Sequence, residues 1–145
     1  DSVASRGLGD VYKRQGTDIV SIDRIRAVLL DHGERFIERC FTEEERGYVE
    51  RKAGTNSDIA VAGYAKRWAA KEACAKALGL GIRDHIHLKD IAVVNDSAGK
   101  PAIQLTGGAK ERLTRITPES MTVDIHVSLS DEPPMALAFV IISAK

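Results

Sequence analysis

The residues best suited to chemistry in this sequence lie on one predicted helix. The segment RWAAKEACAKALG, which begins at Arg67, is dense in alanine and has no internal proline, so it favours a helix. At helical spacing, Trp68, Glu72 and Lys76 fall along one stripe, and Arg67 and Lys71 form a second, adjacent stripe. One interpretation is a solvated ion pair between Glu72 and Lys76. The other is that Glu72 binds a divalent cation while the basic side chains receive phosphates.

A second carboxylate, Asp18, lies at the end of a short predicted strand in the sequence GTDIV. Aspartate is a poor strand former, so it serves there either as a turn or capping residue or as a ligand. Magnesium is bound through one or two carboxylates together with substrate phosphates. Asp18, Glu72 and a pyrophosphate would form such a site, provided that the fold brings the two carboxylates together.

The hydrophobic periodicity predicts the elements that must position these side chains, with helices in the first half of the chain and strands in the second. We expect strands at 17–20, 88–94, 102–105, 121–130 and 135–142, and helices at 22–40 with an interruption at Gly33, 43–52, 59–78 and 108–116. Thr42 and Glu45 form a predicted capping box, Asp58 a predicted N-cap and Gly79 a predicted C-cap.

The strand pattern indicates the fold class. Segment 121–130 alternates apolar and polar residues, which is typical of a strand with one buried face. Segment 135–142 is apolar on both faces, which predicts that helices cover one face and another subunit the other. We therefore expect an α+β fold with helices packed on a largely antiparallel sheet. We interpret residues 1–15 as a foreign leader, a few residues of which could join the first strand, and residues 16–145 as a single domain.

Composition excludes several classes of protein. The chain has 145 residues, and its 21 Lys and Arg balance its 21 Asp and Glu, which argues against an electrostatic nucleic-acid binder or membrane binder. No apolar run approaches the roughly 20 residues that span a bilayer. The two cysteines, Cys40 and Cys74, form no metal-binding motif, and free thiols are typical of a reducing cytoplasm.

Beyond these patterns, the sequence resembles the holo-acyl-carrier-protein synthases, the small 4′-phosphopantetheinyl transferases of bacterial fatty-acid synthesis. The similarity covers about residues 16–144. The matching motifs, in order, are GTDIV, the RF-x-ER run, FTEEE, RWAAKEACAKALG, GKP and HVSLS. The chain departs from the family at Asp131, where many relatives have histidine. It also has VYKRQ at 11–15, where relatives have an apolar strand.

The resemblance implies transfer of the phosphopantetheine arm of coenzyme A to a serine of apo-acyl carrier protein, with release of adenosine 3′,5′-bisphosphate. It implies that Asp18 and Glu72 bind Mg²⁺ and that Lys76 stabilises the pyrophosphate. Two acceptors for the serine proton stay open, a water molecule on the cation, which we favour, and Glu72.

The remaining expected contacts also come from the resemblance. Those on the coenzyme side are Arg67, Lys71, Gly79, Gly99, Lys100, Pro101 and Ser130. On the carrier-protein side, Arg24, Arg35 and Arg39 would meet an acidic partner. The family fold implies a homotrimer with active sites at subunit boundaries.

Two other functions use the same residues. A magnesium-dependent nucleotide hydrolase or transferase could use the two carboxylates without a carrier protein, although the sequence has no Walker-type glycine-rich loop. A non-catalytic oligomeric module could bind acidic carrier domains through the three arginines, and it would tolerate Glu72→Gln.

Overall fold

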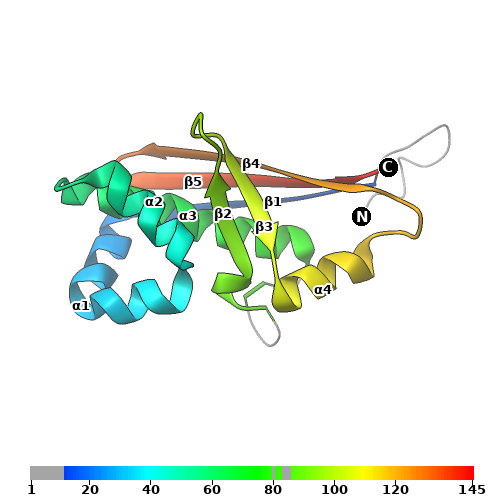
Figure 1. Cartoon of the computed structure of the whole chain (residues 1–145), viewed down its shortest axis with the longest axis horizontal. Helices are drawn as coiled ribbons and strands as arrows, with labels where there is room; N and C mark the ends of the chain where they lie inside the picture. The colour runs from blue at the N-terminus through cyan, green and yellow to red at the C-terminus, as the bar shows by residue number, and fades with distance from the viewer. Residues whose placement is uncertain (1–11, 80, 83–85) are drawn as a thin grey trace.

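A three-stranded antiparallel sheet and the long helix across it form the frame of the molecule (Figure 1). The computed structural model describes residues 12–79, 81–82 and 86–145. The strand order is β1-β5-β4, so β1 and β4 are the two edges. The strands and helices are β1 (Tyr12–Ser21), α1 (Ile22–Cys40), α2 (Glu43–Ala53), α3 (Ser57–Leu78), the 3-10 turn η2 (Leu88–Asp90), β2 (Ile91–Asn95), β3 (Pro101–Leu105), α4 (Gly107–Ile116), β4 (Val123–Glu132) and β5 (Met135–Ala144).

The α3 helix is the centre of the core. It packs on β1 and β5, and its alanines lie against small residues of the central strand. Ala69, Ala73, Ala136 and Ala138 are all completely buried. Small side chains on both surfaces let the helix approach the sheet closely. This close packing determines where the side chains of α3 lie relative to the strands.

The predicted pattern of the last two strands is confirmed. In β4 the half-buried and exposed residues alternate along the whole strand. In β5 the inward residues are buried, whereas Leu137 on the opposite face is 40% exposed and Phe139 and Ile141 are partly exposed. The outer face of the sheet therefore carries apolar side chains that no element of the described chain covers.

A second, two-stranded sheet of β2 and β3 packs beside α2 and α3, and β3 lies next to β4. Its strands are joined by a turn at 96–100, in which Gly99 has a φ of 89°. This hairpin brings the GKP segment to the β4 side of α3. The α+β class and the largely antiparallel pairing that the sequence predicts are thus confirmed.

Several boundaries differ from the prediction. β1 begins at Tyr12, so residues 12–15 of the expected leader pair with β5 as part of the first strand. Asn56, rather than Asp58, caps α3, because its side chain accepts the amide hydrogens of Asp58 and Ile59. The first three residues of the expected strand at 88–94 form the turn η2.

Other local predictions hold. Gly33 has non-helical backbone angles and kinks α1, and Thr42 and Glu45 form the capping box of α2. Cys40 and Cys74 are buried free thiols. Over the residues described, no helix combines the length and apolar character needed to cross a membrane.

Candidate active site

Asp18 and the C-terminal half of α3 meet at the β1 edge of the sheet. Gly16 makes the close approach possible, because a Cβ at this position would lie 1.9 Å from the carbonyl oxygen of Ala73. Asp18 lies two residues further along the strand and therefore on the same face. Its Oδ1 accepts a hydrogen bond from Lys76 Nζ at 3.0 Å, and Lys76 also donates to the carbonyl oxygen of Thr17 at 3.0 Å.

Glu72 lies one helical turn before Lys76 on the same face of α3 and therefore belongs to the same cluster. Burial raises the pKa of Glu72, the negative charge of Asp18 raises this pKa further, and the ammonium of Lys76 opposes both effects. The two carboxylates therefore lie close enough to repel each other. This is the arrangement that a shared cation would stabilise.

The donor set suits a magnesium ion. The Asp18 side chain is only 14% exposed, and its Oδ2 is buried with no hydrogen-bond partner among the described residues. No group of three or more His, Cys, Asp or Glu side chains with metal-binding geometry occurs within the ranges described. A pair of carboxylates is what Mg²⁺ uses when substrate phosphates and water complete its shell.

Lys71 does not lie where the sequence predicted. Its side chain is completely buried, and its ammonium donates to Glu45 Oε1 at 2.7 Å and to the carbonyl oxygens of Leu88 and Ile91. Burial lowers the pKa of Lys71, and the neighbouring Glu45 carboxylate opposes this shift. Because its ammonium has three acceptors inside the protein, Lys71 connects α3 to α2 and β2 through buried hydrogen bonds and does not extend toward a phosphate.

Arg67 lies on the opposite side of α3, in a cavity of about 260 Å³. Its side chain donates to the carbonyl oxygen of Gly63 and to Asn95 Oδ1, and its guanidinium lies over the ring of Tyr48 at 4.9 Å. Gly99 and Pro101 of the predicted GKP contact also line this cavity. The fold therefore brings together three of the residues expected on the coenzyme side.

Sequence reasoning missed part of this cavity. Its other lining residues are Tyr48, Val49, Lys52, Ile59, Gly63, Lys66, Asn95 and Leu129. Arg51 and Lys52 lie in the last turn of α2, where cations commonly complement the helix dipole, so nothing in the local pattern separated Lys52 from an ordinary helix end.

Three other predicted coenzyme contacts lie apart from the cavity lining. Lys100 is exposed in the β2–β3 turn, and its backbone amide donates to Asp96 Oδ1. Ser130 is exposed on the outer face of β4. Gly79 is the left-handed C-cap of α3, with a φ of 87°, and a Cβ there would meet the guanidinium groups of Arg14 and Arg112.

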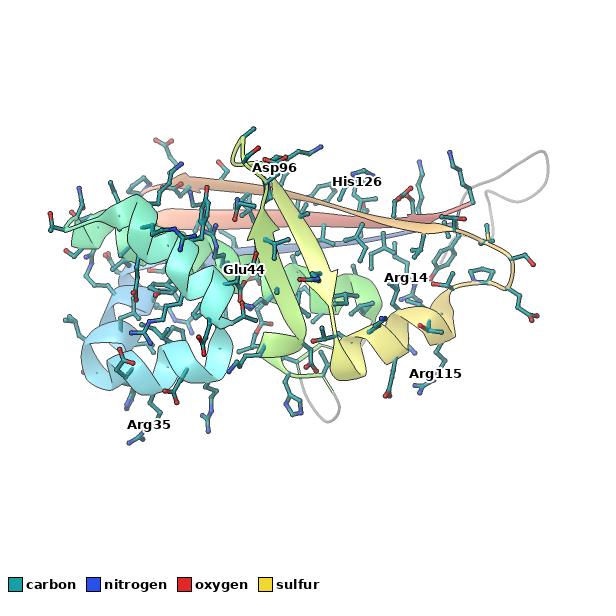
Figure 2. The ribbon with its side chains drawn as sticks, viewed as in Figure 1. Arg14, Arg35, Glu44, Asp96, Arg115 and His126 are labelled. Carbon is teal, nitrogen blue, oxygen red and sulfur yellow. The ribbon has the colours of Figure 1, made fainter. Side chains whose placement is uncertain are left out.

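The three predicted carrier-binding arginines are all exposed on α1. Arg35 and Arg39 line a shallow groove with Val28, His32 and Phe36. The side chain of Arg35 extends away from the body of the molecule (Figure 2). Arg24 lies on the other side of the kink at Gly33, so it belongs to the first half of the helix.

A family model described as the 4′-phosphopantetheinyl transferase superfamily matches residues 14–138. The chain belongs to this family. A holo-[acyl-carrier-protein] synthase of Rhodopseudomonas palustris strain TIE-1 is 54% identical over 129 residues, which cover 89% of this chain and 88% of the relative. This level of identity over most of the chain makes it an enzyme of the holo-[acyl-carrier-protein] synthase type.

Solved structures of such synthases share the fold. The enzyme of Bacillus anthracis, in complex with CoA (3′,5′-ADP), is 33% identical, with a TM-score of 0.67 over 91% of this chain and 96% of that one. The enzyme of Helicobacter pylori in complex with coenzyme A is 27% identical, with a TM-score of 0.71 over 88% of this chain and 98% of that one.

Within this synthase the candidate site consists of two separated parts. Asp18 on β1 and Leu129 in the cavity on β4 both pair with Ala138 of the central strand, so they lie at opposite edges of the sheet. The α3 helix packs between them over β5. Glu72 and Arg67 are five residues apart on this helix, which places them about 140° apart around its axis. The carboxylate cluster and the cavity therefore face opposite sides of α3.

Proposed function

We propose that this enzyme transfers the 4′-phosphopantetheine arm of coenzyme A to a serine of apo-acyl carrier protein and releases adenosine 3′,5′-bisphosphate. We further propose that it requires Mg²⁺ and that it acts in the cytoplasm, where it catalyses a step of fatty-acid biosynthesis. The observation that carries the proposal is the cluster of Asp18, Glu72 and Lys76, in which a buried carboxylate oxygen has no hydrogen-bond partner among the residues that the structure describes.

The residues of this cluster have distinct roles in the proposed reaction. Asp18 and Glu72 would hold the Mg²⁺ ion, which would neutralise charge on the diphosphate when bound. Lys76 is half exposed and already lies beside Asp18, so its ammonium can donate a hydrogen bond to a diphosphate oxygen of the coenzyme, on the side of the departing bisphosphate. The serine oxygen forms a new bond to the phosphorus atom that carries the pantetheine arm, and the bond from this phosphorus to the adenosine 3′,5′-bisphosphate breaks. The serine proton passes to water or to Glu72.

The cavity supports binding of the nucleotide part of the coenzyme. Lys52, Lys66 and Arg67 give it a positive lining, and Tyr48 contributes an aromatic surface. The relatives of Bacillus anthracis and Helicobacter pylori were solved with CoA-type ligands, which agrees with a coenzyme site in this fold.

The separation of the two parts supports a homotrimer with shared active sites. A second copy whose β4 edge lies beside β1 of the first would bring its cavity to the carboxylate cluster. The outer face of the sheet offers an apolar surface for such contacts, with Ile19 59% exposed and Leu137 40% exposed. Exposed apolar patches of this kind are typical of subunit interfaces.

The surface of α1 supports recognition of the carrier protein. Arg24, Arg35 and Arg39 are exposed, and the groove beside the last two is also lined by the apolar side chains of Val28 and Phe36. An acidic helix with an apolar face would find complementary charge and a hydrophobic contact here.

The decisive experiment is to incubate the protein with coenzyme A, Mg²⁺ and an apo-acyl carrier protein and to measure the intact mass of the carrier. We expect a gain of one phosphopantetheine, which a chelator abolishes. Asp18→Asn and Glu72→Gln should each lower the rate by about a hundredfold or more, because each removes a cation ligand.

Glu44→Gln is the matched control, since Glu44 is an exposed carboxylate on α2 (Figure 2) and its loss should leave the rate unchanged. Near-normal transfer by the Asp18 or Glu72 variant contradicts the proposed metal site. A carrier that gains no mass with the unmodified enzyme contradicts the proposed function as a whole.

A further inference from the structure

The cavity beside α3 has the character of an anion site. Lys52, Lys66 and Arg67 line it, and the described lining residues include no Asp or Glu. Arg67 is only 4% exposed, and its Nε has no hydrogen-bond partner in the part of the chain that the structure describes. A buried guanidinium with an unused donor is stabilised by an anionic or hydrogen-bond-accepting ligand.

Asp131 holds one of the three cations in place. Lys66 Nζ lies 3.0 Å from Asp131 Oδ1, and the two side chains are 29% and 30% exposed. Asp131 follows the lining residue Leu129 by two positions on β4, so both point to the same face. Asp131 is not itself among the described lining residues. It therefore contacts Lys66 without being part of the cavity wall.

The chemistry of the coenzyme indicates which anion this cavity would receive. Coenzyme A carries a diphosphate and, separately, a phosphate monoester on the 3′ position of its ribose. Under the proposed function the diphosphate lies at Asp18 and Glu72. The monoester is then the remaining anion for the positively charged cavity.

We propose, on the basis of that function, that Lys66 binds the 3′-phosphate of the coenzyme and that Asp131 is a positioning residue for Lys66. Lysine has a flexible four-carbon side chain that loses rotamer freedom when it binds. An ion pair at its tip limits this freedom before the ligand arrives. The pair thus determines how strongly the enzyme distinguishes coenzymes with the 3′-phosphate from those without it.

The test is calorimetric titration of the full chain with adenosine 3′,5′-bisphosphate and with adenosine 5′-monophosphate, which lacks the 3′-phosphate. Lys66→Gln should weaken binding of the bisphosphate by about tenfold, the size of one charge-assisted hydrogen bond, and change binding of the monophosphate less than about twofold. Lys66→Arg should retain the preference. The control is Lys110→Gln, at an exposed position on α4, which should change neither affinity.

Asp131→Asn tests the positioning role. It should weaken bisphosphate binding by about threefold when Lys66 is present and have no further effect in the Lys66→Gln background, as expected for residues that act together. If Asp131 acted only by repelling phosphate, Asp131→Asn would strengthen bisphosphate binding in both backgrounds, and the positioning role would be overturned.

The remaining outcomes separate this inference from the function on which it rests. If Lys66→Gln weakens both nucleotides equally or neither of them, Lys66 does not select the 3′-phosphate and the inference is overturned. An unmodified enzyme that modifies the carrier but binds both nucleotides equally also overturns the inference alone. An enzyme that transfers nothing from coenzyme A overturns the proposed function instead.

Discussion

At the scale of single residues, the environment of Glu72 predicts how the stability of the folded chain depends on pH. Its pKa is raised by burial and then by Asp18, so the folded state holds this proton more tightly than the unfolded chain does. The stability that this proton contributes is present at acidic pH and is lost as the pH rises above the ordinary pKa of glutamate and through the raised value. Without added metal, Glu72→Gln should therefore raise the melting temperature at neutral pH.

The measurement is thermal unfolding of the unmodified chain and of Glu72→Gln from pH 4 to pH 8 in the presence of a chelator. The difference in melting temperature should shrink toward acidic pH, where Glu72 is protonated in both the folded and the unfolded state. Glu44→Gln, at an exposed position, provides the comparison. A Glu72→Gln variant that is less stable than the unmodified chain at neutral pH would contradict the electrostatic account of the site.

The residue types of the carboxylate cluster could be predicted from sequence, but the role of Lys71 could not. Glu72 and Lys76 share a helix stripe, Asp18 was a candidate second carboxylate from its place in the sequence, and the resemblance implied that it joins them in one site. The sequence could not indicate that Glu45 turns inward, because a capping box specifies only local bonds at a helix start. In the structure the Glu45 carboxylate reaches Lys71 and the backbone amide of Val93, contacts that depend on the tertiary fold.

At the scale of the elements, the contact between β1 and α3 depends on Gly16. Gly16→Ala would place a methyl group 1.9 Å from the carbonyl oxygen of Ala73 and 2.8 Å from the amide nitrogen of Ala77, and neither backbone group can move alone. We expect a loss of about 3 kcal/mol or more in the free energy of unfolding, measured by denaturant titration. Transfer activity should fall as well, because β1 carries Asp18.

Gly47→Ala is the control for this variant. Its added Cβ would lie 3.0 Å from the end of the Arg51 side chain, which is flexible, and alanine favours the helix. The change in stability should stay within about 1 kcal/mol and be favourable. Equal stability losses for the two alanine variants would show that the close approach of β1 to α3 does not matter.

At the scale of the whole molecule, the sequence predicted the layers but not which side chains share a space. The alternation in β4 and the doubly apolar β5 were sufficient to place helices on one face of the sheet. The predicted phosphate-binding residues, however, divide between two sides of α3, because Lys76 meets β1 whereas Arg67 meets the β2–β3 hairpin. Helical spacing describes one element and contains no information about which neighbours cover each side.

The separation of the carboxylate cluster from the cavity also makes the proposed trimer testable. Leu137 is 40% exposed on the outer face of the sheet, so Leu137→Asp places a charge in the proposed subunit interface. Size-exclusion chromatography with light scattering should give a trimer for the unmodified chain and a monomer for the variant, with an unchanged circular dichroism spectrum. Transfer activity should be lost with the trimer, because each carboxylate cluster would lack a partner's cavity.

The control is Leu30→Asp, which changes an 80% exposed leucine on α1 and should remain a trimer. A Leu137→Asp monomer with full activity would mean that one chain contains a complete site.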